Sequence, residues 1–91
     1  MAERFARNPD VLFTELDDGT AVCLLPATEF HFKLNRTALF LWKALEQGPL
    51  PASDLVELLA AAFRVHSETA RADVETVVAH MVRESLLTVV R

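Results

Sequence analysis

The spacing of apolar residues changes once in the middle of the chain, and the change marks the centre of the predicted fold. From Phe30 to Leu34 every second residue is apolar, which is the pattern of a strand with one buried face. Asn35 follows, and its side chain can accept a hydrogen bond from a backbone N–H in the first turn of a helix. Beyond it the apolar residues recur at the i, i+3, i+4, i+7 spacing of an amphipathic helix. They are Ala38, Leu41, Trp42 and Leu45, and we expect strand and helix to share one core.

Two further strands are predicted before this one. Residues 11–16 and 20–25 are rich in β-branched and aliphatic side chains, and Asp18 and Gly19 lie between them. Asp-Gly between two apolar runs is a strong hairpin signal, because glycine adopts positive φ without steric cost. A second turn then leads into residues 28–34. The sequence therefore predicts an antiparallel meander of three strands in chain order, with 28–34 at an edge.

The helix that begins at Asn35 is expected to run to about Glu46 and to stop at Gly48, since glycine favours the left-handed conformation that ends many helices. A second helix is predicted to start near Ser53, which would be its N-cap. Its apolar residues fall on one stripe, formed by Leu55, Leu58, Leu59, Ala62 and Phe63.

A third helix is predicted over residues 68–85, after Ser67, with Glu68 in its first turn, where a negative charge favours the helix dipole. Residues 87–90 fit either a frayed last turn or a short closing strand. The buried stripe of this helix is expected to consist of Ala70, Val74, Val77, Val78 and Met81.

The whole chain, 1–91, is expected to be a single domain in which residues 1–10 form an irregular, polar N-terminal arm. The predicted fold class is α+β, with a three-stranded antiparallel β-meander followed by three α-helices. Such an arrangement is similar to a winged helix-turn-helix domain. A DNA-binding regulator is therefore an alternative, but acidic residues outnumber Arg71 and Arg83 along the third helix, where they would repel phosphates.

Charge and composition narrow the function further. Nine basic residues face thirteen acidic ones, for a net charge of −4, so we expect no nucleic-acid partner. No apolar run approaches the roughly 20 residues that span a bilayer, and no signal peptide opens the chain. We expect no membrane partner and a cytoplasmic location.

Groups that would support catalysis are scattered along the chain. His31, His66 and His80 fall on a strand, a loop and a helix, without the spacing of a zinc site. Cys23 lies between Val22 and Leu24 and is expected to be a buried thiol. The carboxylates at the hairpin tip are expected to be hydrated, with ordinary pKa values. We therefore expect no enzyme, no catalytic residue, no metal and no cofactor.

Two surface features remain as candidates for recognition. The first is the edge strand 28–34, which contains no proline or glycine and would offer unpaired backbone groups to an extended peptide, unless the N-terminal arm covers it or it is simply hydrated. The second is Phe40, which lies on the helix face opposite Trp42. It is a candidate contact for a partner, or else Phe5 covers it.

Three stretches of the sequence resemble a known family. They are AVCLLPATEFHFKLNRTALFLWKALEQG, DLVELLAAAF and ARADVETVVAHMVRESLL. Together they resemble the PqqD-like family, the recognition elements for precursor peptides of ribosomally made natural products. The most telling positions are Leu34 and Asn35 at the strand-to-helix junction, the apolar residues that follow, and residues 72–74.

The resemblance implies a protein without catalytic activity that binds the leader of a precursor peptide as an added strand along 28–34, against helix 68–85. It implies two partners, the leader peptide and a leader peptidase or other peptide-modifying enzyme. By position, the residues implied for peptide binding are Phe30, His31, Phe32, Lys33, Arg71, Asp73, Val74, Glu75 and Val78.

Two pathways fit the resemblance. The favoured one is the stand-alone element of lasso-peptide biosynthesis, which hands a leader to a peptidase. The alternative is a PqqD-type chaperone of pyrroloquinoline quinone biosynthesis, which serves a radical SAM enzyme. The latter proteins usually have a Tyr-Pro-Glu-Gly-like turn before the edge strand, whereas residues 25–28 here are Leu-Pro-Ala-Thr.

Overall fold

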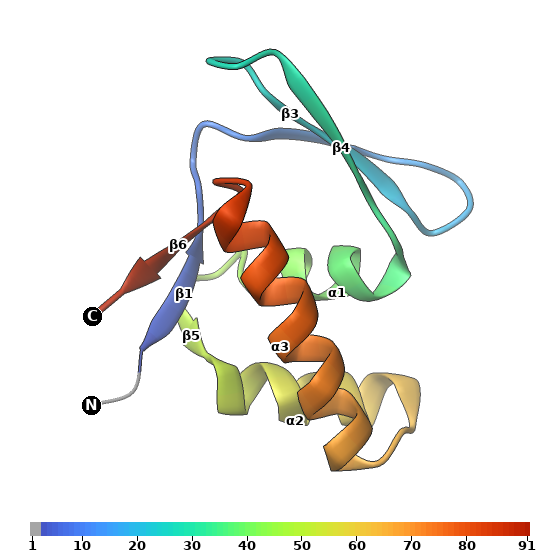
Figure 1. The fold of residues 1–91 in the computed structure, drawn as a ribbon. Helices are drawn as coiled ribbons and strands as arrows, with labels where there is room; N and C mark the ends of the chain where they lie inside the picture. Colours follow the sequence, from blue (N-terminus) through green and yellow to red (C-terminus); the bar gives the residue numbers. More distant parts are fainter. Residues whose placement is uncertain (1–2) are drawn as a thin grey trace.

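A computed structural model describes residues 3–91 and arranges them in three α-helices and two small antiparallel sheets (Figure 1). The predicted α+β class is confirmed, with a meander followed by three helices. The strands are β1 (Arg4–Arg7), β2 (Leu12–Glu15), β3 (Ala21–Leu25), β4 (Phe30–Leu34), β5 (Leu50–Pro51) and β6 (Leu87–Val90). The helices are α1 (Arg36–Ala44), α2 (Ala52–Phe63) and α3 (Ser67–Arg83).

The predicted meander is confirmed as the sheet β2-β3-β4, with β4 at one edge. In its β2–β3 turn, Gly19 has a φ of +84°, which favours glycine. A Cβ at this position would also lie only 3.1 Å from Nε of Arg36. Arg36 in turn donates from Nε to the backbone oxygen of Asp18 at 3.1 Å. The hairpin tip is thereby held against the start of α1.

Helix α1 begins as the sequence predicts and ends earlier. The side chain of Asn35 accepts a hydrogen bond of 2.8 Å from the backbone N–H of Ala38, so Asn35 is the N-cap. The helix ends at Ala44, and its C-cap Leu45 has a φ of −88°. Gly48 lies beyond a turn rather than at the cap, and the prediction that it stops the helix is wrong.

Helix α2 differs from its prediction at its N-terminal end. It begins at Ala52 with Pro51 as N-cap, so Ser53 lies inside the first turn and is not the cap. Its buried residues are Leu55, Val56 and Leu59. Leu58, Ala62 and Phe63, predicted to be buried, are exposed, Leu58 by 44% and Phe63 by 41%.

Helix α3 buries Ala70, Val74, Val78 and Met81 as predicted, while Val77 is half-buried. Phe40 is half-buried, and its role as a contact for a partner stays a prediction. Phe40 packs edge-to-face against Phe63 of α2, with ring centroids 5.5 Å apart, so an intramolecular contact between α1 and α2 uses it.

The prediction of an irregular arm over residues 1–10 is wrong where the structure describes it; residues 1 and 2 lie outside the described part. Residues Arg4–Arg7 form β1, the central strand of a second sheet in the order β5-β1-β6. Residues 87–90 are its edge strand β6, which pairs antiparallel with β1. Of the two alternatives for residues 87–90, a frayed last helical turn or a closing strand, the structure therefore shows the strand.

One arginine explains why a polar segment is ordered here. The guanidinium of Arg7 lies over the ring of Trp42, 4.3 Å from its centroid, and 5.1 Å from that of Phe13. It also approaches Glu46, with Nη1 and Oε1 3.7 Å apart. Arginine stacks on aromatic faces and keeps its charge there. A residue that a hydropathy pattern counts as polar can therefore stabilise the packing of a strand against the core.

The core lies between the sheets and the helices. Trp42, Leu55, Met81 and Cys23 are among its fully buried members, and Phe13 meets the Trp42 ring edge-on at 5.8 Å between centroids. Within residues 3–91 no helix combines the length and the hydropathy that crossing a membrane requires.

Candidate functional site

The outer edge of β4 offers backbone groups that no described strand pairs with. In an antiparallel ladder, successive residues turn their N–H and C=O groups to opposite sides. The N–H of Leu16 donates to the oxygen of Thr20, so the register makes Ala21, Cys23 and Leu25 the residues of β3 that bond to β4. Their partners are Leu34, Phe32 and Phe30. His31 and Lys33 therefore turn their N–H and C=O groups outward.

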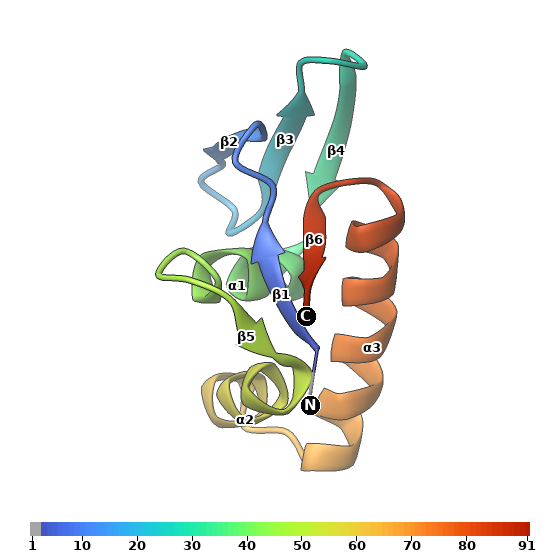
Figure 2. The same ribbon diagram turned by 90° about the vertical axis from the view of Figure 1, so that its left-hand side faces the viewer.

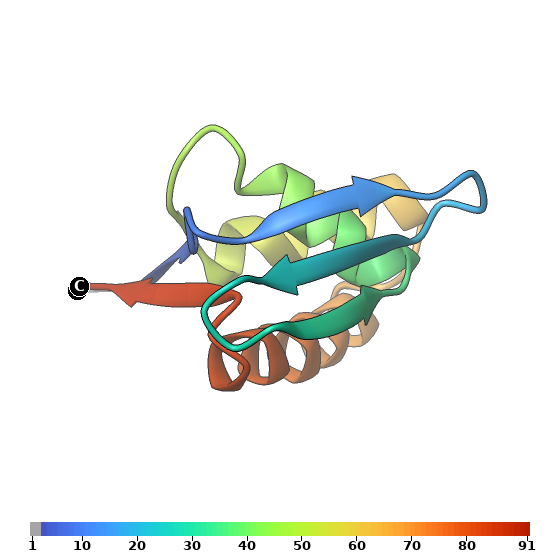
Figure 3. The same cartoon turned by 90° about the horizontal axis from the view of Figure 1, so that it is seen from above.

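The N-terminal arm does not cover this edge in the described residues, because β1 pairs with β5 and β6 instead. In Figures 2 and 3, β4 is the strand of its sheet that lies on the side of α3. The position of β4 thus matches the prediction of an open edge strand on the α3 side of the molecule.

The inner face of β4 changes from exposed to buried along the strand. Phe30 is 63% exposed, Phe32 is half-buried and Leu34 is fully buried. The prediction that Phe30 faces the core is wrong, because the β3–β4 hairpin extends beyond the helices (Figure 1). Phe30 and Phe32 contact each other edge-to-face, with centroids 6.3 Å apart. They form an accessible aromatic surface directly beside the outward backbone groups.

The five residues of α3 implied for peptide binding do not share one surface. Val74 and Val78 are 1% and 5% exposed and belong to the core. Arg71 and Glu75 are four residues apart and therefore lie on the same flank of the helix. Asp73 lies on the opposite flank. All three charged residues are exposed.

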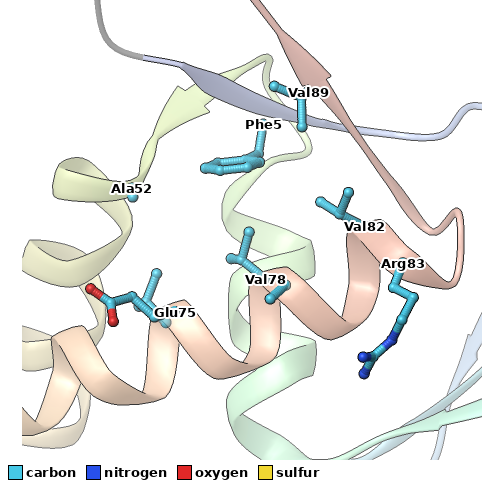
Figure 4. A pocket seen from close by; sticks show the side chains of 9 residues that line it. Phe5, Ala52, Glu75, Val78, Val82, Arg83 and Val89 are labelled. Atoms are coloured by element: carbon cyan, nitrogen blue, oxygen red, sulfur yellow. The ribbon is translucent and has the colours of Figure 1, made fainter.

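A pocket of about 450 Å³ opens on the flank of α3 that carries Glu75, between α3 and the ladder of β1 and β6 (Figure 4). The structure thus brings Val74, Glu75 and Val78 together with residues that were not predicted. The lining consists of Phe5, Ala52, Val74, Glu75, Val78, Ala79, Val82, Arg83 and Val89.

Sequence reasoning missed Phe5 and Val89 because they lie in two short strands at opposite ends of the chain, whose pairing has no local signal. Phe5 and Val89 are register partners across the β1–β6 ladder, so their side chains share one face of the sheet. Val82 was recognisable, since it follows Val78 by four residues and extends the apolar stripe of α3.

The titratable groups do not assemble into a reactive centre in the described residues. His31, His66 and His80 are exposed and apart, and no cluster of three metal-ligating side chains occurs in residues 3–91. Cys23 is fully buried, and burial raises the pKa of its thiol, an effect that the charge of Arg7 partly offsets. The thiol is therefore neutral at pH 7.

The hairpin tip departs from the expectation of an ordinary pKa. The pKa of Asp18 lies below its usual value, chiefly because the Thr20 hydroxyl donates to its carboxylate at 2.5 Å, and the Thr20 backbone N–H adds a bond of 3.0 Å. These bonds belong to the turn and do not point to catalysis.

Comparison with known proteins identifies the family. The model of a family described as "Coenzyme PQQ synthesis protein D (PqqD)" matches residues 20–87. The chain belongs to the PqqD family. Among solved structures, it is similar to one described as TbiB1 in complex with the TbiA(beta) leader peptide, with a TM-score of 0.79 and 22% identity over 90% of this chain and 93% of that one. At this identity the likeness shows a shared fold. No curated protein matches the chain.

The residues matched to the PqqD family include β3, β4 and all three helices. The open edge of β4 therefore lies within the family span. The pocket lies only partly within it, because Phe5 and Val89 are outside residues 20–87.

Proposed function

We propose that this PqqD-family protein binds the leader of a precursor peptide in the biosynthesis of a ribosomally made, modified peptide, and presents it to a processing enzyme without catalysing a reaction itself. The observation that carries the proposal is the open edge of β4, where His31 and Lys33 turn their backbone groups outward. An extended peptide adds to such an edge through main-chain hydrogen bonds, and pockets for alternate side chains supply specificity. We also propose that residues 1–91 act as one recognition domain.

The energetics are adequate for a transient carrier. His31 and Lys33 offer four outward backbone groups, and each bond contributes a net ~0.5–1.5 kcal/mol. One or two apolar side chains of the leader, buried against Phe30 and Phe32, would add about 1.5–3 kcal/mol each. Ordering a flexible peptide costs roughly 2–5 kcal/mol. Micromolar affinity corresponds to about 8 kcal/mol, which these contributions reach toward the upper end of their ranges.

The opposite wall of the site is the flank of α3 that faces away from the pocket. Val77 is half-buried there, and Asp73 and His80 are exposed at helical spacing on either side of it. We infer that Val77 contacts the leader and that Asp73 and His80 supply polar contacts. This assignment replaces Val74 and Val78, whose burial leaves little surface for a peptide.

A solved relative supports the proposal. TbiB1, which shares the fold, is described as a complex with a leader peptide. The favoured processing enzyme is a leader peptidase of the lasso type, because the turn at residues 25–28, Leu-Pro-Ala-Thr, lacks the acid and glycine of the quinone-pathway proteins. The alternative is a radical SAM enzyme of pyrroloquinoline quinone biosynthesis.

The test is a fluorescence polarisation titration with two labelled peptides and a duplex DNA. One peptide is the leader encoded in the short reading frame beside this gene, and the other is a scrambled version of it. Saturable micromolar binding of the leader alone supports the proposal. If the leader does not bind and DNA binds with a steep salt dependence, the alternative of a winged-helix DNA-binding regulator is favoured.

The choice of enzyme needs a second experiment. A lasso-type leader peptidase is incubated with the precursor, and cleavage is followed with and without the purified protein. Faster cleavage at limiting precursor supports the peptidase, whereas an effect only on a radical SAM enzyme supports the alternative.

A further inference from the structure

The pocket between α3 and the β1–β6 ladder has apolar walls and charged ends. Phe5, Val78 and Val82 point into it, while Glu75 lies toward one end and Arg83 toward the other (Figure 4). The three ion pairs found in residues 3–91 involve neither of these two charged side chains. In residues 3–91 the pocket is therefore apolar in the middle, with an acidic group and a basic group at its ends that take part in no ion pair. Nη2 of Arg83 lies 3.3 Å from Nδ1 of His80, which carries no carboxylate.

The spacing of these charges suits an extended chain. Glu75 and Arg83 are eight residues apart on α3, which corresponds to about 12 Å along the helix axis at ~1.5 Å per residue. An extended polypeptide rises ~3.3 Å per residue, so about four residues cover the same distance. A ligand that neutralises both ends therefore carries a basic and an acidic residue about four positions apart.

A strand edge that no strand within residues 3–91 pairs with adjoins the same pocket. β6 is the outer strand of its sheet and lies between β1 and α3 (Figure 2). The N–H of Asn8 donates to the oxygen of Leu86, and the alternation of the ladder then turns the backbone groups of Leu87 and Val89 away from β1. Val89 also lines the pocket, so a segment paired with this edge would place its side chains there.

We propose that this pocket is a second docking site, which takes an extended segment of a partner protein. The segment pairs with the outer edge of β6, buries apolar side chains against Phe5 and Val82, and sets a basic residue at Glu75 and an acidic residue at Arg83. The site is separate from the leader site, because β4 lies on the other flank of α3. The proposal does not rest on leader binding at β4.

The test uses acetylated and amidated pentapeptides and two-dimensional NMR of the labelled protein. Lys-Val-Leu-Val-Glu and its reverse, Glu-Val-Leu-Val-Lys, carry both charges in the two possible directions, and Lys-Val-Leu-Val-Lys and Glu-Val-Leu-Val-Glu are controls with equal apolar content. We expect one mixed peptide to shift the amide signals of Val82 and Val89 and to bind roughly fivefold more tightly than either control. Equal affinities for all four peptides, or shifts confined to β4, would overturn the proposal.

A pair of alanine variants tests the location. Ala79 is exposed and lines the pocket, whereas Ala72 is exposed on the same helix outside it. Ala79→Phe is expected to fill the opening and to weaken binding of the mixed peptide at least tenfold, and Ala72→Phe to leave it unchanged. Equal effects of the two variants would contradict the assignment.

The leader peptide serves as an independent readout. Under the proposal, Ala79→Phe binds the leader as tightly as the unchanged protein, and a saturating leader does not displace the mixed pentapeptide. Displacement accompanied by shifts at Val89 would show that the leader itself occupies the pocket and would refute a second site. If the leader does not bind while the mixed pentapeptide still does, leader binding at β4 is refuted and the second site is not.

Discussion

Replacing His31 by proline removes one outward backbone donor from β4 and leaves the bonds to β3 in place. Phe30, Phe32 and Leu34 make the bonds to β3, and the N–H of His31 points to the free edge. Proline is tolerated in an edge strand where its missing N–H would face solvent. The variant is therefore expected to fold and to lose affinity for the leader.

The size of the loss follows from the number of bonds. His31 and Lys33 offer two N–H and two C=O groups, and proline at position 31 deletes one of these four. A backbone hydrogen bond contributes a net ~0.5–1.5 kcal/mol, so the dissociation constant of the leader should rise about two- to tenfold. The same substitution at Lys33 should have an effect of the same size.

The assay is fluorescence polarisation with the labelled leader, and circular dichroism confirms that each variant is folded. His31→Ala is the matched control, because it removes the imidazole and keeps the backbone N–H. It should bind the leader as the unchanged protein does. A folded His31→Pro variant with unchanged affinity would refute strand addition at β4. Equal losses in the alanine and proline variants would show that the imidazole, and not the backbone, makes the contact.

Three further predictions concern the fold. Arg7→Ala should lower the free energy of unfolding by about 1–2 kcal/mol in urea titrations, since it removes the stack on Trp42, and an unchanged midpoint would contradict that role. Cys23 should resist iodoacetamide at pH 7 in the native protein and react once urea unfolds it; rapid native labelling would show that the thiol is accessible. The carboxylate of Asp18 has a lowered pKa, so its stabilising effect is present above its ordinary value of 3.8 and is lost as pH falls through the native value. Asp18→Asn should flatten this acid dependence, and an unchanged dependence in thermal unfolding would contradict the assignment to Thr20.

The centre of the fold was predictable because local chemistry and periodicity agree there. Asn35 caps α1, Gly19 closes the first hairpin, and the alternation up to Leu34 marks β4. Each of these signals involves residues close in sequence, and tertiary contacts reinforce them.

The second sheet could not be predicted, because its strands are short and their pairing joins opposite ends of the chain. Arg4–Arg7 contains two arginines, and its order depends on the stack of Arg7 on Trp42, a contact between distant residues. The pocket was missed for the same reason, since Phe5 and Val89 meet only through this pairing.

The edge position of β4 was predictable from the sequence, but the direction of its backbone groups was not; peptide binding at this edge stays a prediction. Periodicity shows which side chains share a face, but it does not show which backbone groups point outward. For that reason Phe32→Pro looks from sequence like a test of peptide binding, whereas the register shows that Phe32 bonds to Cys23. Similarly, Val74→Glu would place a charge in the core and unfold the protein instead of probing a groove.

The most direct test of leader binding at β4 is amide hydrogen exchange, measured by NMR with and without the leader peptide. We expect the leader to slow exchange of the amides of His31 and Lys33, which face the open edge. Exchange of the Phe32 amide, which is already bonded to β3, should stay nearly unchanged. Saturable binding of the leader without protection of His31 and Lys33 would contradict strand addition and place the peptide elsewhere on the protein.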